Sequence, residues 1–288
     1  SNGVPYPIKI IMSAIILDGK KLSEKILSDL KKEISEINRP IELAIVLVGN
    51  NPASLAYTKR KQKIGEELGI KVKIYKYEEN ISTRKLREEI NKLNKNKKIK
   101  GIIAQLPLPN HINTESMLDA IKAKKDIDVL GRESVGRLYK NKSKILPPTV
   151  AGIKKLLDEY KIEYKGKNVA IVGYGSLVGK PASMVFANEG ASIFVLRSST
   201  KNKNKLLREA DIIISGVGKP NLITKKDVKK GVIIMDAGMS EQNGKLVGDV
   251  ADEVKKIAKY ITPVPGGVGP MTVAMLFWNL LELVKNRS

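Results

Sequence analysis

The stretch ASLAYTKRK at residues 53–61 brings three polar side-chain types into a regular spacing. If it is helical, Ser54, Tyr57 and Lys61 lie three and then four residues apart and share one face. A hydroxyl, a phenol and an amine on one face could orient a substrate and transfer protons. The pattern also fits an ordinary exposed helix, because lysine and tyrosine commonly cover helix surfaces. Other segments must decide between these interpretations.

A glycine-rich segment, VAIVGYGSLVGKP, begins in a predicted strand at residue 169 and leads into a predicted helix. Gly173, Gly175 and Gly179 give the spacing GxGxxxG, one residue longer than the usual dinucleotide fingerprint. Glycine lets the backbone approach a pyrophosphate closely, and the start of a helix supplies N–H donors. An ordinary glycine-rich turn is the alternative, but the strand-to-helix context favours nucleotide binding.

The end of the next predicted strand indicates which dinucleotide binds. NAD-binding domains usually carry Asp or Glu there, where it holds the ribose hydroxyls. Here the chain reads LRSST at 196–200. Arg197 and Ser198 suit a 2′-phosphate, and no acidic residue nearby would repel it. The sequence therefore predicts NADP over NAD, the alternative being that Arg197 is only a surface cation.

Composition excludes several classes of function. The chain of 288 residues is 42% hydrophobic and contains no cysteine, so disulfides, thiolate nucleophiles and cysteine metal sites are excluded, and no metal site is predicted. A net charge of +22 raises nucleic acid as a partner, but the densest lysine runs carry no aromatic residues for base stacking. No apolar run approaches the roughly 18 residues of a membrane span. We expect neither nucleic acid nor membrane as a partner.

Apolar runs alternate with amphipathic helical patterns from residue 14 onward. Strands are predicted at 41–49, 72–77 and 100–109, and helices after the first strand, at 82–94 and at 114–123. Single helices between strands imply right-handed crossovers and a parallel sheet. We assign residues 13–148 to an N-terminal α/β catalytic domain, and residues 1–12 to a cloning scar or upstream extension.

A second α/β unit follows a helix predicted at 147–160. Its strands are predicted at 167–173, 192–197, 211–218 and 232–238. We assign residues 149–268 to a Rossmann-like NADP-binding domain. The strongly apolar helix at 270–285 is expected to be buried, so residues 269–288 are predicted to pack back on the N-terminal domain.

Three further segments surround the glycine loop: GIIAQLPLP (101–109), KKDIDVLGRESVGRL (124–138) and ITPVPGGVGPMT (261–272). With PASLAYTKRK they resemble the bifunctional methylenetetrahydrofolate dehydrogenase/methenyltetrahydrofolate cyclohydrolase family over residues 13–285. The resemblance implies two α/β domains with a cleft between them, and a cytoplasmic homodimer. It implies oxidation of 5,10-methylenetetrahydrofolate with NADP+ and hydrolysis of the methenyl product to 10-formyltetrahydrofolate. A catalytically dead folate- or nucleotide-binding protein is the alternative.

The resemblance also implies roles for individual residues. Lys61 would be the catalytic amine, Tyr57 would stack against the folate, and Ser54 would support their helix face. Gln105 would hydrogen-bond the lysine, and Asp128 would hold the pterin ring. The loop that closes over the substrate would contain Pro265, Gly266, Gly267 and Val268. The residues that contact NADP would be Gly175, Ser176, Val178, Ser198, Gly218 and Thr272, beside Gly173, Gly179 and Arg197.

The chain departs from the family motif at one position and partly matches a second enzyme class. The family usually has Asp-Gly where Asp128-Val129 stands here, so we expect the backbone to avoid a conformation that requires glycine. The pair Tyr57-x-x-x-Lys61 also matches short-chain dehydrogenases. In those enzymes the pair follows the nucleotide loop, whereas here it precedes the loop by more than a hundred residues, which excludes that class.

Overall fold

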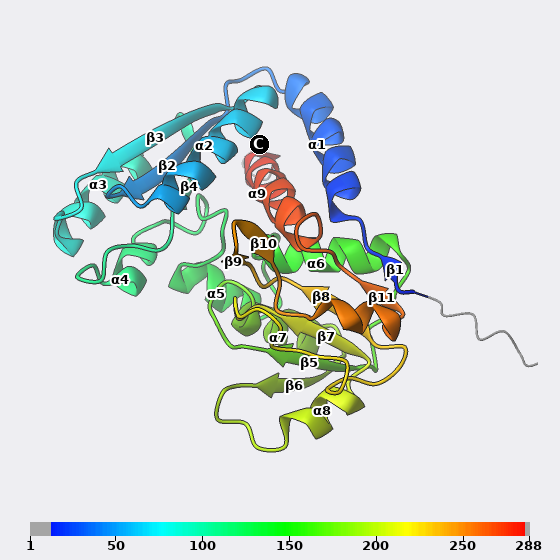
Figure 1. Cartoon of the computed structure of the whole chain (residues 1–288). Helices are drawn as coiled ribbons and strands as arrows, with labels where there is room; N and C mark the ends of the chain where they lie inside the picture. The colour runs from blue at the N-terminus through cyan, green and yellow to red at the C-terminus, as the bar shows by residue number, and fades with distance from the viewer. Residues whose placement is uncertain (1–12, 286–288) are drawn as a thin grey trace, which may run out of the picture.

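The computed structural model describes residues 13–285, so the extension proposed for residues 1–12 lies outside the described part. The chain forms a three-stranded and a six-stranded parallel sheet, each covered by helices (Figure 1). This is the predicted α/β class with two sheets. A short antiparallel hairpin, β9 (Ser240–Gln242) and β10 (Lys245–Val247), was not predicted.

The three-stranded sheet has the order β3 (Lys71–Tyr77), β2 (Glu42–Val48), β4 (Ile99–Ala104). Every residue of β2 is buried, as expected of a central parallel strand. Helices α2 (Pro52–Glu67) and α3 (Thr83–Lys95) make the crossovers, and the predicted Ser82 cap of α3 accepts the N–H of Lys85. The helix predicted at 114–123 is wrong in length. α4 (Thr114–Leu118) ends early because the chain then runs beside β4. There the backbone carbonyl of Lys125 accepts the N–H of Ile102.

The six-stranded sheet holds the second α/β unit. Its order is β1 (Ile15–Ile16), β11 (Tyr260–Ile261), β8 (Ile233–Asp236), β7 (Ile212–Ser215), β5 (Asn168–Val172) and β6 (Ser192–Leu196). The edge strand β1 comes from the segment that we had assigned to the N-terminal domain. Its backbone pairs with β11, and the chain then enters α1 (Gly19–Ser35). The domain boundaries at 148 and 268 stay predictions.

The remaining helices surround the two sheets. α6 (Pro148–Glu159) is the helix predicted at 147–160, and α7 (Gly179–Asn188) follows the glycine loop. α5 (Arg132–Tyr139), α8 (Lys203–Glu209) and the 3-10 helix η1 (Asp252–Lys256) were not predicted. All three have eight residues or fewer, too short for a clear hydrophobic period.

The last helix, α9 (Val268–Lys285), is a core helix that connects the two halves. Its 18 residues have a mean hydropathy of 1.2, so one segment is long and apolar enough for a membrane span, which corrects the expectation from the sequence. However, 56% of it is buried in the protein. It packs against α1, α6 and β4, and Figure 1 shows it between the three-stranded sheet and α6. A Cβ on Gly101 would lie 2.7 Å from Leu280, and a Cβ on Gly65 would lie 2.4 Å from Val72 and 3.2 Å from Phe277, so both glycines allow this close packing.

Candidate active site

Lys61 and Gln105 form a direct contact between a helix and the end of a strand. Lys61 Nζ, from α2, donates to Gln105 Oε1 at 3.1 Å. Gln105 immediately follows β4, and its Nε2 donates to the carbonyl of Leu106 at 2.8 Å, so its amide oxygen stays directed at the lysine. Burial lowers the pKa of Lys61, opposed by the negative charge of Asp128. A lowered pKa leaves a larger fraction of the amine unprotonated near neutral pH, where it can accept a proton.

Asp128 lies at the same edge of the three-stranded sheet. Asp126 bridges Ile102 of β4 in a parallel register, so two residues later Asp128 reaches the carboxyl end of β4, next to Gln105. Burial raises the pKa of Asp128 to about 6; the charge of Lys61 opposes this rise and that of Asp126 adds to it. Asp128 is therefore mostly a carboxylate at neutral pH and can accept N–H donors.

Tyr57 and Ser54 precede Lys61 on α2 and differ from it in their side-chain hydrogen bonds. The Tyr57 hydroxyl donates to the thioether of Met239 at 3.2 Å, which joins α2 to the segment after β8. Ser54 is buried, and its hydroxyl is the buried side-chain polar atom that finds no hydrogen-bond partner among residues 13–285. Met239 was not predicted, and the cleft between the domains stays a prediction.

The glycine loop lies between β5 and α7. Gly173 has a φ of 89°, and a Cβ on Gly179 would lie 2.2 Å from the Gly173 carbonyl oxygen, so both positions require glycine. A Cβ on Gly175 would meet nothing within 4 Å, so this glycine borders open space. α7 begins at Gly179 without a side-chain cap. The N–H of Lys180 donates to the Gly175 carbonyl at 3.0 Å and Pro181 has no N–H, which leaves the N–H of Gly179 to an anion. Ser176 and Val178 lie in this loop.

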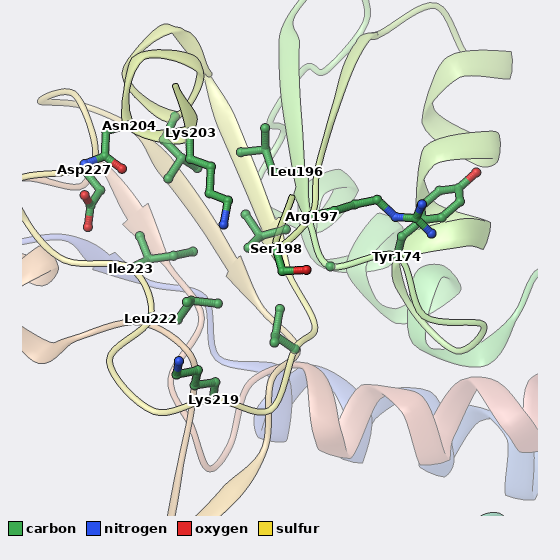
Figure 2. Close-up of a pocket in the computed structure, with 14 residues that line it drawn as sticks. Tyr174, Leu196, Arg197, Ser198, Lys203, Asn204, Lys219, Leu222, Ile223 and Asp227 are labelled. Carbon is green, nitrogen blue, oxygen red and sulfur yellow. The ribbon is translucent and has the colours of Figure 1, made fainter. Parts of the chain in front are cut away.

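A pocket of about 470 Å³ opens beside the loop, at the ends of β5, β6 and β7. Gly173, Arg197 and Ser198 line it; the other predicted cofactor residues do not. The Arg197 guanidinium lies 4.9 Å from the centre of the Tyr174 ring. Figure 2 shows this pair on one side of the pocket and two lysines that were not predicted, Lys203 and Lys219, on the other. The lining combines apolar side chains with three cations and one carboxylate, Asp227, which accepts the N–H and the hydroxyl of Thr224. The excess of cations suits an anionic nucleotide.

The comparisons with known proteins cover nearly the whole chain. The catalytic-domain model of tetrahydrofolate dehydrogenase/cyclohydrolase matches residues 17–128, and the NAD(P)-binding-domain model of that family matches residues 147–288. The bifunctional protein FolD of Nitratiruptor sp. is 44% identical over 278 residues, which are 95% of this chain and 99% of the relative. This chain belongs to the tetrahydrofolate dehydrogenase/cyclohydrolase family.

Solved structures of the family share this fold. The bifunctional FolD methylenetetrahydrofolate dehydrogenase/cyclohydrolase of Campylobacter jejuni superposes with a TM-score of 0.93 at 42% identity, covering 96% of this chain and 100% of that one. The Trypanosoma brucei enzyme, solved with NADP and an inhibitor, gives a TM-score of 0.90 at 32% identity, covering 96% and 99%.

The family's PVPGGV segment packs against the start of α1. The Gly266 carbonyl accepts the N–H of Lys20 at 2.8 Å, and a Cβ on Gly19 would lie 2.0 Å from the Gly267 carbonyl oxygen. Pro265 is exposed, whereas Gly267 and Val268 are buried. Thr272 lies one turn into α9, where its hydroxyl donates to Val268. Closure of this segment over a substrate stays a prediction.

Val129 contradicts our expectation for the position where the family usually has glycine. Its φ is 58°, so the backbone keeps the left-handed conformation despite a β-branched side chain. Such a conformation costs roughly 1–2 kcal/mol. Asp126 holds the turn by accepting the N–H groups of Leu130 at 3.0 Å and Gly131 at 2.8 Å, and the Val129 side chain is 1% exposed. Hydrogen bonds and burial therefore keep the turn that follows Asp128.

Asn279, in the middle of α9, supports the same segment. Its Nδ2 donates to the carbonyls of Ile127 at 2.8 Å and Leu146 at 2.7 Å, and the residue is buried. The helix thereby fixes the residue just before Asp128. A single amide within the apolar run AMLFWNLLELV was a signal that could have identified this role.

Proposed function

We propose that this chain oxidises 5,10-methylenetetrahydrofolate with NADP+ and hydrolyses the resulting 5,10-methenyltetrahydrofolate to 10-formyltetrahydrofolate. The observation that carries the proposal is the contact of Lys61 with Gln105, beside Asp128, in a chain that also has the glycine loop and its adjoining pocket. Lys61, Gln105 and Asp128 suit proton transfer, and the glycine loop with its pocket suits dinucleotide binding. The paired reactions require both.

The residues around the pocket fit NADP. The open space beside Gly175 would take the pyrophosphate, and the N–H of Gly179 at the start of α7 would donate to it. Arg197 and Ser198 would hold the 2′-phosphate, since no acidic residue follows β6 until Glu209. Hydride acceptance is the chemistry that the nicotinamide supplies when bound.

For the oxidation, the chain's main task is to orient the folate. Loss of hydride from the methylene carbon spreads positive charge over N5 and N10, so no strong acid or base is needed. Asp128 would accept N–H groups of the pterin ring, and Tyr57 would stack against the folate. Asn279 and the turn held by Asp126 keep Asp128 in place.

For the hydrolysis, Lys61 would move protons. Water adds to the methenyl carbon, and the neutral amine of Lys61 takes a proton from it. The ammonium that forms then protonates N5 as the C–N5 bond breaks, and the proton of the remaining hydroxyl is released to water, which leaves the formyl group on N10. Gln105 Oε1 accepts a hydrogen bond from Lys61 and so fixes the amine throughout.

A paired assay tests this proposal. Methylenetetrahydrofolate is supplied with NADP+ or NAD+, and reduced nicotinamide and the methenyl intermediate are followed together. We expect nicotinamide reduction with a lower KM for NADP+ and a methenyl signal that decays. Binding of folate without turnover would instead favour the catalytically dead alternative. Cytoplasmic location and a homodimer are part of the proposal, and light scattering tests the dimer.

A further inference from the structure

Asp249 is a buried carboxylate that the proposed reactions do not use. It is 0% exposed and follows the β9–β10 hairpin. Its Oδ2 accepts the hydroxyl of Ser215 at 2.6 Å and the N–H of Val217 at 2.8 Å, and its Oδ1 accepts the N–H of Lys219 at 2.7 Å. Three donors from the end of β7 and the following loop thus converge on one carboxylate.

The loop that Asp249 holds is a wall of the nucleotide pocket. Val217 and Lys219 both line the pocket, and Figure 2 labels Lys219. Gly218 between them has a φ of 75°, and its carbonyl accepts the hydroxyl of Ser240 at 2.7 Å. Because the N–H groups of Val217 and Lys219 are directed at Asp249, their positions depend on this carboxylate.

The packing around Asp249 admits little change. A Cβ on Gly238 would lie 2.1 Å from Asp249 Cγ, so only glycine fits there. The neighbouring Asp236 accepts the N–H groups of Gly238 at 2.9 Å and Val250 at 3.0 Å but makes no hydrogen bond to the 217–219 loop in the described part of the chain. Burial raises the pKa of Asp236 to about 6, and the negative charge of Asp249 adds to the rise. Asp236 also accepts the backbone N–H of Asp249, so it holds the segment that carries this carboxylate.

We propose that Asp249 is a positioning residue for dinucleotide binding, which acts by holding the 217–219 loop in the shape that lines the pocket. The inference rests on the proposed function, since it takes this pocket as the dinucleotide site. The effect of Asp249 should be confined to the oxidation, because hydrolysis of the methenyl substrate involves no hydride transfer and no dinucleotide.

The substitution Asp249→Asn keeps the size of the side chain but removes one acceptor. The Ser215 hydroxyl can rotate to accept from the new amide group, whereas the N–H groups of Val217 and Lys219 can only donate. One of them must therefore face an N–H₂ group, whichever way the amide turns. We expect the KM for NADP+ to rise about tenfold, the usual order for one unsatisfied buried group, with kcat for methenyltetrahydrofolate hydrolysis changed less than threefold.

Asp211→Asn is the matched control, because Asp211 accepts the N–H of Asn168 at 2.9 Å in the same sheet, does not line the pocket and makes no hydrogen bond to the 217–219 loop among the described residues. Its KM for NADP+ should stay within threefold of the unmodified protein. An equal rise of the KM for NADP+ in both variants would overturn the proposal in favour of a general structural role. So would a loss of hydrolysis in Asp249→Asn as large as its loss of oxidation.

If Asp249→Asn does not fold, Ser215→Ala removes a single hydrogen bond and should raise the KM for NADP+ about threefold; no rise would overturn the proposal. An unmodified protein with no NADP+ saturation would instead refute the proposed function.

Discussion

The folate side and the dinucleotide side of this protein are organised differently. On the folate side, Lys61 contacts Gln105, Gln105 contacts its own strand end, and Asp128 is fixed by the segment around it. On the dinucleotide side, Arg197, Lys203 and Lys219 surround a pocket of about 470 Å³.

The difference follows from the chemistry of the two sides. Proton transfer needs an amine whose pKa is set by burial and fixed neighbours, so these contacts exist in the protein itself. Dinucleotide binding needs a shaped wall and positive charge, whose partner atoms belong to the ligand. A substitution of the group that transfers protons should therefore alter turnover, whereas a substitution of a group that holds the folate or the dinucleotide should alter the KM for that ligand.

Replacement of Lys61 should give the largest effect. Lys61→Met removes the group that moves protons, and we expect methenyltetrahydrofolate hydrolysis to fall by about 10³-fold, within the range for general acid–base catalysis. Folate binding, measured by fluorescence quenching, should persist. Lys63→Met on the same helix is the matched control, because that side chain is 80% exposed and should leave hydrolysis intact. Unchanged hydrolysis in Lys61→Met would remove this lysine from the mechanism.

Replacement of Arg197 should affect binding of one dinucleotide. Arg197→Ala should raise the KM for NADP+ by about 10- to 100-fold, the order of a charge-assisted hydrogen bond, and leave the KM for NAD+ unchanged. Arg208→Ala on α8 serves as control, because Arg208 bonds the carbonyl of Lys226 and does not line the pocket. A parallel rise for both dinucleotides would show that Arg197 does not read the 2′-phosphate.

The pH dependence of folate binding should reflect Asp128. Its pKa is raised to about 6, so the carboxylate that accepts pterin N–H groups is present above that pH and is lost as pH falls through it. We expect the KM for folate to rise up to about tenfold between pH 7 and pH 5. In Asp128→Asn the KM should be higher at pH 7 and nearly independent of pH. A wild-type KM that is flat over this range would contradict the role of Asp128.

The smallest effect concerns the backbone beside Asp128. Because φ is 58° at Val129, Val129→Gly should be more stable than Val129→Ala by about 1 kcal/mol. Val46 in the buried strand β2 is the control, where glycine should be less stable than alanine. Urea unfolding of the four variants measures both differences. If Val129→Gly were instead less stable than Val129→Ala, the backbone of this turn would store no strain.

The sequence alone identified the features that depend on local pattern. Continuous apolar runs predicted β2, β5, β7 and β8, and the glycine spacing predicted the strand–loop–helix unit at 172–180. The types and order of the motif residues were sufficient to identify the family. The contact of Lys61 with Gln105 joins two of those motifs, PASLAYTKRK and GIIAQLPLP. Periodicity and glycine geometry act within a few residues, so a sequence records them directly.

Only the tertiary structure decided the features that depend on distant segments. Residues 15–16 join the six-stranded sheet because β11, more than 240 positions later, offers them an edge. Tyr57 meets Met239, Asn279 fixes the segment before Asp128, and Asp249 gathers the loop after β7. Val129 keeps a conformation that its own type disfavours, because Asp126 and the surrounding core hold the turn. Each of these features depends on packing and hydrogen bonds between segments that are far apart in the sequence. No local sequence pattern records which of those segments meet.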